Sequence, residues 1–224
     1  DGSPFDDEDR TLLTAFAGQA AVAIENARLF AETDQALTER VEELSVMQRI
    51  DRELNAALDV QRVMDITLSW AMTNSRASAG SVGMVTEAGI QIIATHGYGD
   101  TVEGLSDRPL SIERGLMGRV VRTGQMSLVR DVRADPDYRG ILPATRSQLT
   151  IPIVREQVVV GLLNLESPDV DGFSPAQVEF VTRLLDHAAV AITNARLYAE
   201  VNAANIAKSE FVSVAAHELK TPMT

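Results

Sequence analysis

The sequence of 224 residues contains no cysteine, only two lysines and few aromatic residues. Without cysteine there are no disulfides and no thiolate metal ligands, which agrees with a reducing compartment. No run of about 18 apolar residues is present, so the sequence predicts no membrane-spanning helix. Lys and Arg total 20 against 32 Asp and Glu, and the net charge of −12 argues against a nucleic-acid-binding protein.

Apolar residues make up 45% of the chain, which is enough for a packed core. A length of 224 residues accommodates one domain of about 100–150 residues together with extended segments. We therefore expect one compact domain and long helices beside it.

An internal repeat organises the chain. Residues Phe5–Thr33 and Phe173–Val201 align without gaps, and 13 of 29 positions are identical. Apolar residues recur at helical spacing in both copies, so both are predicted to be packing helices. In the second copy Ser174 is a suitable N-cap, Pro175 suits the first helical position, and Gln177 completes a capping box.

Residues 34–57 are polar, contain neither Gly nor Pro, and predict a long helix. Leu37, Val41 and Leu44 follow heptad-like spacing, but two later steps of three residues interrupt a strict repeat. We expect a coiled coil that dimerises through this seam. A solvated connecting helix with one core-facing stripe is the alternative.

Residues 58–198 show a mixed pattern of helices and strands. Asp59–Thr73 is a helix candidate, and short reversals between the strand candidates predict an antiparallel sheet of the α+β class. Pro152 falls inside a strand candidate and is expected at a bulge or at an edge position. The strand candidates are Ser81–Thr86, Ile90–His96, Ser127–Val132, Leu149–Val154 and Val158–Glu166.

The C-terminal segment contains the hexapeptide His217-Glu218-Leu219-Lys220-Thr221-Pro222. In a helix His217 and Thr221 share one face, and Glu218 is adjacent to the imidazole. Pro222 removes the hydrogen-bond partner of a carbonyl one turn earlier, so a kink is expected there.

This hexapeptide resembles the H-box of sensor histidine kinases. The resemblance implies that His217 accepts the γ-phosphoryl group of ATP and that Glu218 is the general base. It also implies that Thr221 orients water when the partner response regulator is dephosphorylated. Without the surrounding motif, His217 would be an ordinary solvated residue.

Residues 58–198 resemble a GAF domain along their whole length. The resemblance is carried by Arg114–Gln125, Asp131–Tyr138, Ser147–Val154 and Gly161–Glu166, in that order. The two copies of the repeat resemble the last helix of such a domain. The implied fold is an antiparallel sheet with packing helices, flanked by long coiled-coil-like helices.

The resemblances together divide the chain into four parts. These are 1–33, the last helix of a preceding truncated GAF domain; 34–57, a signalling coiled-coil helix; 58–198, a complete GAF domain; and 199–224, a linker helix that leads into the phosphoacceptor helix.

The GAF resemblance also implies a ligand pocket between one face of the sheet and the loops of residues 96–145. The bound ligand stays unknown: the cyclic-nucleotide signature is not found, and covalent bilin attachment is excluded because cysteine is absent. Haem ligation by His96 stays open as a minor alternative, no metal site is expected, and His187 is expected to pack or hydrogen-bond. The residues placed at the pocket by resemblance are His96, Tyr98, Met117, Tyr138 and Arg146, with Met84, Met126 and Ile141.

Two functions remain. The first is the sensory and dimerisation region of a cytoplasmic two-component sensor histidine kinase, with an upstream membrane anchor left open. Its expected partners are a second copy of the chain, a response-regulator receiver domain and an unknown small molecule. ATP and Mg would act on the full-length kinase, because the ATP-binding domain is expected to lie outside this chain. The alternative is a non-catalytic tandem-GAF module that serves another output, and the H-box distinguishes the two.

Overall fold

The computed structural model describes residues 6–99 and 108–220, and for residues 36, 39 and 213–220 it describes the helical backbone alone. The chain forms two compact units, which divide between Arg49 and Ile50. The first unit holds most of one long helix, α1 (Asp7–Ala56). Apolar side chains along it, such as Phe16, Leu37 and Val41, are exposed.

The second unit begins with the last turns of α1 and contains every other described element. These are α2 (Val60–Ser75), β1 (Ala79–Thr86), β2 (Gly89–His96), α3 (Gly115–Thr123), β3 (Ser127–Val129), a 3-10 turn (Val132–Ala134), β4 (Ser147–Arg155), β5 (Val158–Ser167) and α4 (Pro175–Lys220).

The five strands form one antiparallel sheet in the order β2-β1-β5-β4-β3. Every predicted strand is present, and the predicted α+β class with packing and flanking helices is confirmed. The largest difference is β3, which ends at Val129, because the backbone turns into the 3-10 helix at Val132.

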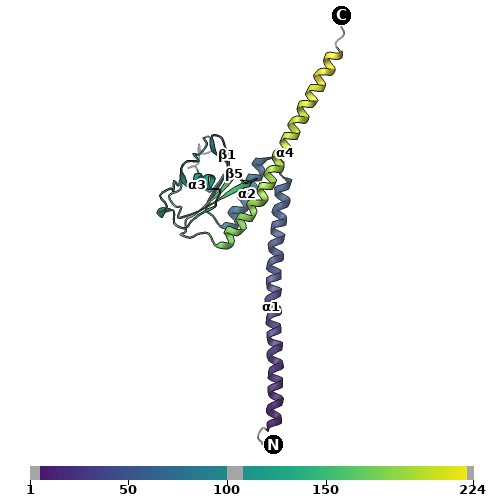
Figure 1. The fold of residues 1–224 in the computed structure, drawn as a ribbon, viewed down its shortest axis with the longest axis vertical. Coiled ribbons are helices and arrows are strands. Elements are labelled where there is room, and N and C mark those ends of the chain that lie inside the picture. Colours follow the sequence, from purple (N-terminus) through teal and green to yellow (C-terminus); the bar gives the residue numbers. More distant parts are fainter. Residues whose placement is uncertain (1–5, 100–107, 221–224) are drawn as a thin grey trace. The chain divides into compact units, whose positions relative to one another are not determined.

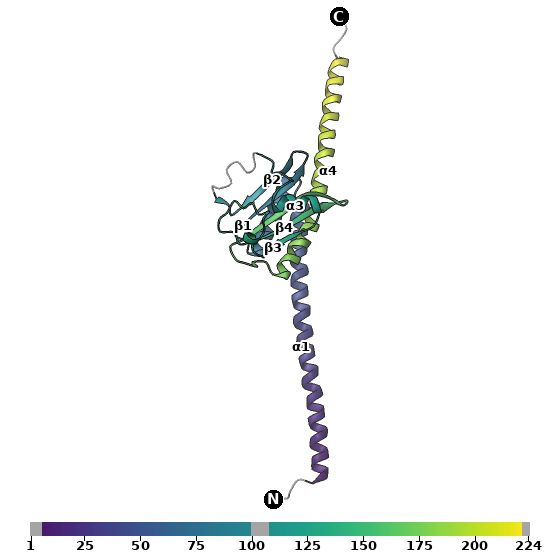
Figure 2. The same ribbon diagram turned by 60° about the vertical axis from the view of Figure 1, so that its left-hand side comes forward.

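Alternation along β4 and β5 separates the two faces of the sheet. Paired residues of an antiparallel ladder point to the same side. Leu149 pairs with Leu165 on the apolar side, and Leu165 lies beside Met72 of α2. Gln148 pairs with Glu166 on the opposite side. Figures 1 and 2 show α2 and α4 side by side along the first face, while α3 lies across the second.

Pro152 occupies the edge-like position that was expected of it. It pairs with Leu162 of β5, but β3 covers only the Gln148–Thr150 part of β4. The missing N–H of Pro152 therefore costs no ladder hydrogen bond on the β3 side. The register also shifts at the next step of the ladder, between Ile153 and Val154.

Side-chain caps fix where the two packing helices start. Asp59 accepts a hydrogen bond of 2.7 Å from the backbone N–H of Arg62 at the start of α2. The predicted capping box at α4 is confirmed: Ser174 N–H donates to Gln177 Oε1 at 2.8 Å, and Gln177 N–H donates to Ser174 Oγ at 3.3 Å. Gln177 Nε2 also donates to the carbonyl of Ser75, which ties α4 to the end of α2.

Both long helices are continuous across the boundaries that the sequence suggested. α1 runs through residues 33 and 34, and α4 runs through residues 198 and 199. No helix among the described residues combines the length and the apolar character that crossing a bilayer requires.

Candidate functional site

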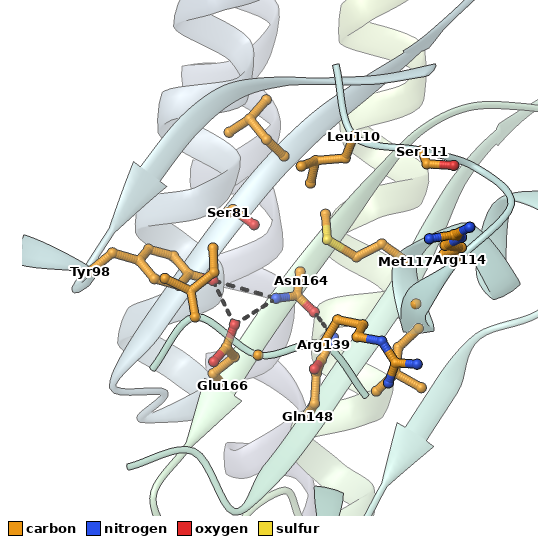
Figure 3. Close-up of a pocket in the computed structure, with 15 residues that line it drawn as sticks. Ser81, Tyr98, Leu110, Ser111, Arg114, Met117, Arg139, Gln148, Asn164 and Glu166 are labelled. Carbon is orange, nitrogen blue, oxygen red and sulfur yellow. Dashed lines mark hydrogen bonds between the residues drawn. The ribbon is translucent and has the colours of Figure 1, made fainter. Parts of the chain in front are cut away.

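A cavity of about 270 Å³ lies on the face of the sheet that α2 and α4 leave uncovered. Strands β1, β2, β4 and β5 supply its floor, and α3 and the segments at residues 110 and 140 supply its walls (Figure 3). It is lined by Ser81, Ile92, Tyr98, Leu110, Ser111, Arg114, Gly115, Leu116, Met117, Arg139, Gly140, Ile141, Gln148, Asn164 and Glu166.

A buried carboxylate is the centre of the polar floor. Glu166 is only 5% exposed. Its Oε1 accepts hydrogen bonds from the Tyr98 hydroxyl at 2.9 Å and from Asn164 Nδ2 at 3.2 Å. Its Oε2 accepts one from the Thr145 hydroxyl at 2.5 Å. All three donors are neutral, and no ion pair involves Glu166 in the described parts of the chain.

The eight residues between the two described ranges add no cationic side chain. Residues 100–107 read Asp-Thr-Val-Glu-Gly-Leu-Ser-Asp and contain no Lys, Arg or His. A buried carboxylate without a cationic partner is costly in a low-dielectric interior. Among the described residues no cationic side chain pairs with Glu166, which therefore gives the floor of the cavity a negative charge.

Neighbouring polar side chains fix the orientation of Asn164. Gln148 Nε2 donates to Asn164 Oδ1 at 2.6 Å, and the Thr150 hydroxyl donates to the same oxygen at 2.8 Å. With Oδ1 occupied by two donors, the Nδ2 group points to Glu166 and Tyr98. The network is buried and determines which Asn164 atoms face the carboxylate.

The backbone at Gly97 places Tyr98 at this floor. Gly97 has φ of +82°, and a Cβ there would lie 2.1 Å from the carbonyl oxygen of Ser78, so only glycine fits. Burial raises the pKa of the Tyr98 phenol well above its ordinary value, and the negative charge of Glu166 raises it further. Tyr98 is therefore a neutral donor to Glu166.

Two arginines lie on the side of the cavity away from Tyr98 (Figure 3). Arg114 directly precedes α3, and its side chain makes no capping hydrogen bond there. Arg139 Nη1 donates to the carbonyls of Pro136 and Tyr138, each at 2.8 Å. Both arginines are exposed, so the cavity is negative at its floor and positive at this rim.

The structure brings part of the expected pocket together. Tyr98, Met117 and Ile141 line the cavity. Tyr138 is half-buried, with its hydroxyl against Gly140, which does line it.

The other expected pocket residues lie elsewhere. Met84 is buried in β1, and Met126 is exposed beside β3. Arg146 pairs with Asp131 at 3.0 Å. His96 is exposed at the end of β2 and borders a separate hollow next to α2, so it does not face this cavity.

Four polar residues of the floor were not identified from the sequence: Ser81, Gln148, Asn164 and Glu166. The available signal was the alternation of polar and apolar residues in Gln148–Ile151 and Leu163–Glu166. That alternation predicts one polar face for both strands, and the structure places this face under the cavity.

Two of the three histidines lie on α4. His187 Nδ1 lies 2.6 Å from Asp51 Oδ1, which confirms the hydrogen-bonding role expected of it. His217 and Glu218 lie in the helical backbone of α4, and their side chains are outside the described residues. Thr221 and the kink expected at Pro222 are likewise outside the described residues. The described residues contain no group of three His, Asp or Glu side chains able to hold a metal ion.

Curated relatives match parts of the chain. Protein ZMO0507 of Zymomonas mobilis is 35% identical over 74 residues, which are 33% of this chain and 46% of that protein. Hybrid signal transduction histidine kinase G of Dictyostelium discoideum is 33% identical over 93 residues, which are 35% of this chain and 3% of that protein. The chain thus spans less than half the length of either relative.

A solved structure and a family model match the sheet domain. The GAF domain of a phosphoenolpyruvate-protein phosphotransferase from Coxiella burnetii superposes with a TM-score of 0.62 at 21% identity, over 70% of this chain and 96% of that chain. This likeness shows the fold. The family model described as GAF domain matches residues 57–193, which is more than half of the chain. The chain therefore belongs to the GAF domain family.

Proposed function

We propose that this chain is the sensory and dimerisation region of a cytoplasmic two-component sensor histidine kinase. In this proposal the GAF domain passes a signal from its cavity through α4 to the phosphoacceptor His217. The observation that carries the proposal is the continuity of α4, which packs against the GAF domain near its start and remains helical to Lys220. The similarity to a hybrid histidine kinase supports a role in signal transduction.

A short path joins the cavity to α4. Glu166 lines the cavity from β5, and its carbonyl accepts a hydrogen bond of 2.9 Å from the N–H of Ser78. After β5, Gly172 N–H donates to Ser147 Oγ at 3.1 Å, and Gln177 then connects α4 to Ser75. A change at the floor of the cavity can therefore alter the first turns of α4.

The helix carries such a change over a long distance. His187 contacts Asp51 within the GAF unit, and His217 follows 30 residues later. At about 1.5 Å per residue this separation is roughly 45 Å. A rotation or a shift of α4 would reach His217 because a continuous helix transmits both.

Exposed apolar side chains on α4 favour a parallel homodimer. Val190, Leu197, Ala204 and Phe211 lie at intervals of seven residues and are all exposed. A repeat of seven keeps these residues on one seam of a left-handed coiled coil. Two copies joined along this seam would place their His217 residues at the same level.

The chemistry of the proposed site is phosphoryl transfer. Imidazole titrates near neutral pH, so His217 can be a neutral nucleophile assisted by Glu218 as general base. Phosphoryl transfer depends on positioning of the phosphate and on neutralisation of its charge. A kinase catalytic domain would provide both by binding ATP and Mg next to His217. The receiver domain of a response regulator would then take the phosphoryl group, and Thr221 would orient water in the reverse, dephosphorylating reaction.

The test is transfer of label from radioactive ATP to the chain by a separately supplied histidine-kinase catalytic domain. The proposal predicts acid-labile, base-stable label on the wild-type chain and none on His217→Gln. Absence of label on a folded wild-type chain, and on the same chain within the full-length protein, would favour the ligand-binding module that serves another output.

A further inference from the structure

We propose that the cavity binds a small zwitterion with an apolar body, the chemistry of an apolar α-amino acid. Its ammonium group would contact Glu166, and its carboxylate would lie between Arg114 and Arg139. This inference rests on the proposed sensory role of the cavity and names the class of ligand that it takes.

The floor of the cavity selects a cation. Glu166 is buried and receives three hydrogen bonds, all from neutral groups. A carboxylate has about four lone-pair positions, so one position remains for a donor from a ligand. An ammonium group would both use that position and neutralise the buried charge, whereas an anion placed there would be repelled.

The side of the cavity away from Tyr98 selects an anion. Arg114 and Arg139 line it with their exposed guanidinium groups, and the first residues of α3, Gly115 to Met117, line it as well. The hydrogen bonds of Arg139 to Pro136 and Tyr138 come from Nη1, so they hold the guanidinium in place. Arginine is well suited to a carboxylate because its donors match the two oxygens.

The walls between these two ends are apolar. Ile92, Leu110, Leu116, Met117 and Ile141 surround the space between the carboxylate floor and the arginines. A volume of about 270 Å³ lies near the lower limit for ligand cavities, which favours a molecule of amino-acid size. A nucleotide would bring several negative charges close to Glu166, and nothing at the floor would compensate them.

The experiment is isothermal titration calorimetry on the purified chain with a matched set of probes. Each of five apolar amino acids is tested beside the acid that lacks its amino group and the amine that lacks its carboxylate. The five are L-valine, L-leucine, L-isoleucine, L-methionine and L-phenylalanine. We expect saturable binding of at least one amino acid. Loss of either charged group should weaken that binding about 10- to 100-fold, as expected for hydrogen bonds between charged groups.

Variants locate the two ends of the ligand. Glu166→Gln should abolish the preference for the amino acid over its deaminated acid. Arg114→Gln and Arg139→Gln should reduce the preference for the amino acid over its amine. Glu87→Gln, at the exposed β1–β2 turn, removes one carboxylate that does not line the cavity and should change neither preference. The comparison of probes needs only wild-type protein, so it tests the zwitterion proposal even where Glu166→Gln fails to fold.

Two results would overturn the inference: no probe binds to a folded chain, or the deaminated acid binds as tightly as the amino acid. Failure of the relay would look different. Tight, charge-dependent binding that leaves phosphorylation of His217 unchanged would contradict the relay and keep the assignment of the ligand. A chain that accepts phosphoryl groups but binds no probe would contradict the assignment of the ligand and keep the proposed phosphoacceptor role of His217.

Discussion

The Tyr98 hydroxyl lies 2.9 Å from Glu166, although 68 positions separate the two residues in the chain. Tyr98 follows the edge strand β2, and Glu166 lies near the end of β5 in the interior of the sheet. The contact therefore joins two parts of the domain across β1. It also completes the polar floor of the cavity, so its loss should be measurable in stability as well as in ligand binding.

Tyr98→Phe should lower the free energy of unfolding by about 1–3 kcal/mol at pH 7, because a buried carboxylate loses one donor. Urea unfolding followed by circular dichroism measures this change. Tyr198→Phe removes an exposed tyrosine from α4 and should leave the midpoint unchanged. Equal stability of the Tyr98→Phe variant and wild type would show that the contact contributes nothing.

The same pair predicts a dependence on alkaline pH. The folded state raises the pKa of Tyr98, so the phenol stays protonated when folded but loses its proton in the unfolded chain above about pH 10. The stabilisation that this shift represents is complete below pH 10 and is lost as pH rises further. Above pH 10 the wild type should lose stability more steeply than Tyr98→Phe, and parallel curves would contradict this.

Asp135→Asn should destabilise the domain by about 1 kcal/mol at neutral pH, the upper range for a partly exposed ion pair. Arg119 Nη2 lies 2.8 Å from Asp135 Oδ2, and the contact joins α3 to the segment after the 3-10 turn. The hydrogen bonds from Arg119 lower the pKa of Asp135. The stabilisation is therefore present above about pH 4 and is lost as pH falls through the lowered pKa. Thermal unfolding at pH 7 and pH 2.5 tests this, since the difference between variant and wild type should be smaller at the lower pH.

Leu197→Glu should convert the dimer into a monomer, because it places charge in the proposed seam of α4. Leu197 is 51% exposed in the single chain, so the substitution should leave the fold of the GAF domain intact. Ala199→Glu is the matched control, since position 199 points to the opposite side of the helix. Analytical ultracentrifugation should show a monomer only for the Leu197 variant. A wild-type chain that is monomeric at high concentration would contradict the dimer.

Insertions into α4 should distinguish the effect of helical phase on signalling from the effect of helix length. Seven alanines placed after Ala203 preserve the heptad phase, whereas two alanines rotate everything that follows by about 200°. In the full-length kinase the seven-residue insertion should keep autophosphorylation responsive to ligand, and the two-residue insertion should abolish that response. Equal behaviour of both insertions would mean that α4 transmits nothing through its rotation.

Local sequence patterns were sufficient to predict the helices and strands of the fold. The strand candidates and the short reversals between them correspond to the five strands, and α4 begins at Pro175, the first helical position that the capping box predicts. Both long helices continue through 33/34 and 198/199, because composition changes there without any residue that ends a helix. A change in polarity alters what a helix packs against and leaves its backbone hydrogen bonds intact.

The cavity could be predicted only in part, because it depends on which strands become neighbours. Tyr98 and Met117, which the resemblance placed at a ligand pocket, line this cavity. The sequence alone does not distinguish Glu166 from any other polar residue in a strand. Its place at the cavity follows from the sheet order, in which β5 lies between β1 and β4. His96 lies two residues before Tyr98, but the left-handed turn at Gly97 directs the two side chains to different hollows.

His96, His187 and His217 are the three histidines of the chain, and they allow a direct test of the phosphoacceptor. Each is replaced by glutamine in turn, and acid-labile label is measured after incubation with a histidine-kinase catalytic domain and radioactive ATP. The account predicts that His96→Gln and His187→Gln keep the label of the wild type and that His217→Gln loses it. Label that persists in His217→Gln, or that disappears only with one of the other two, would contradict the proposed role of this helix.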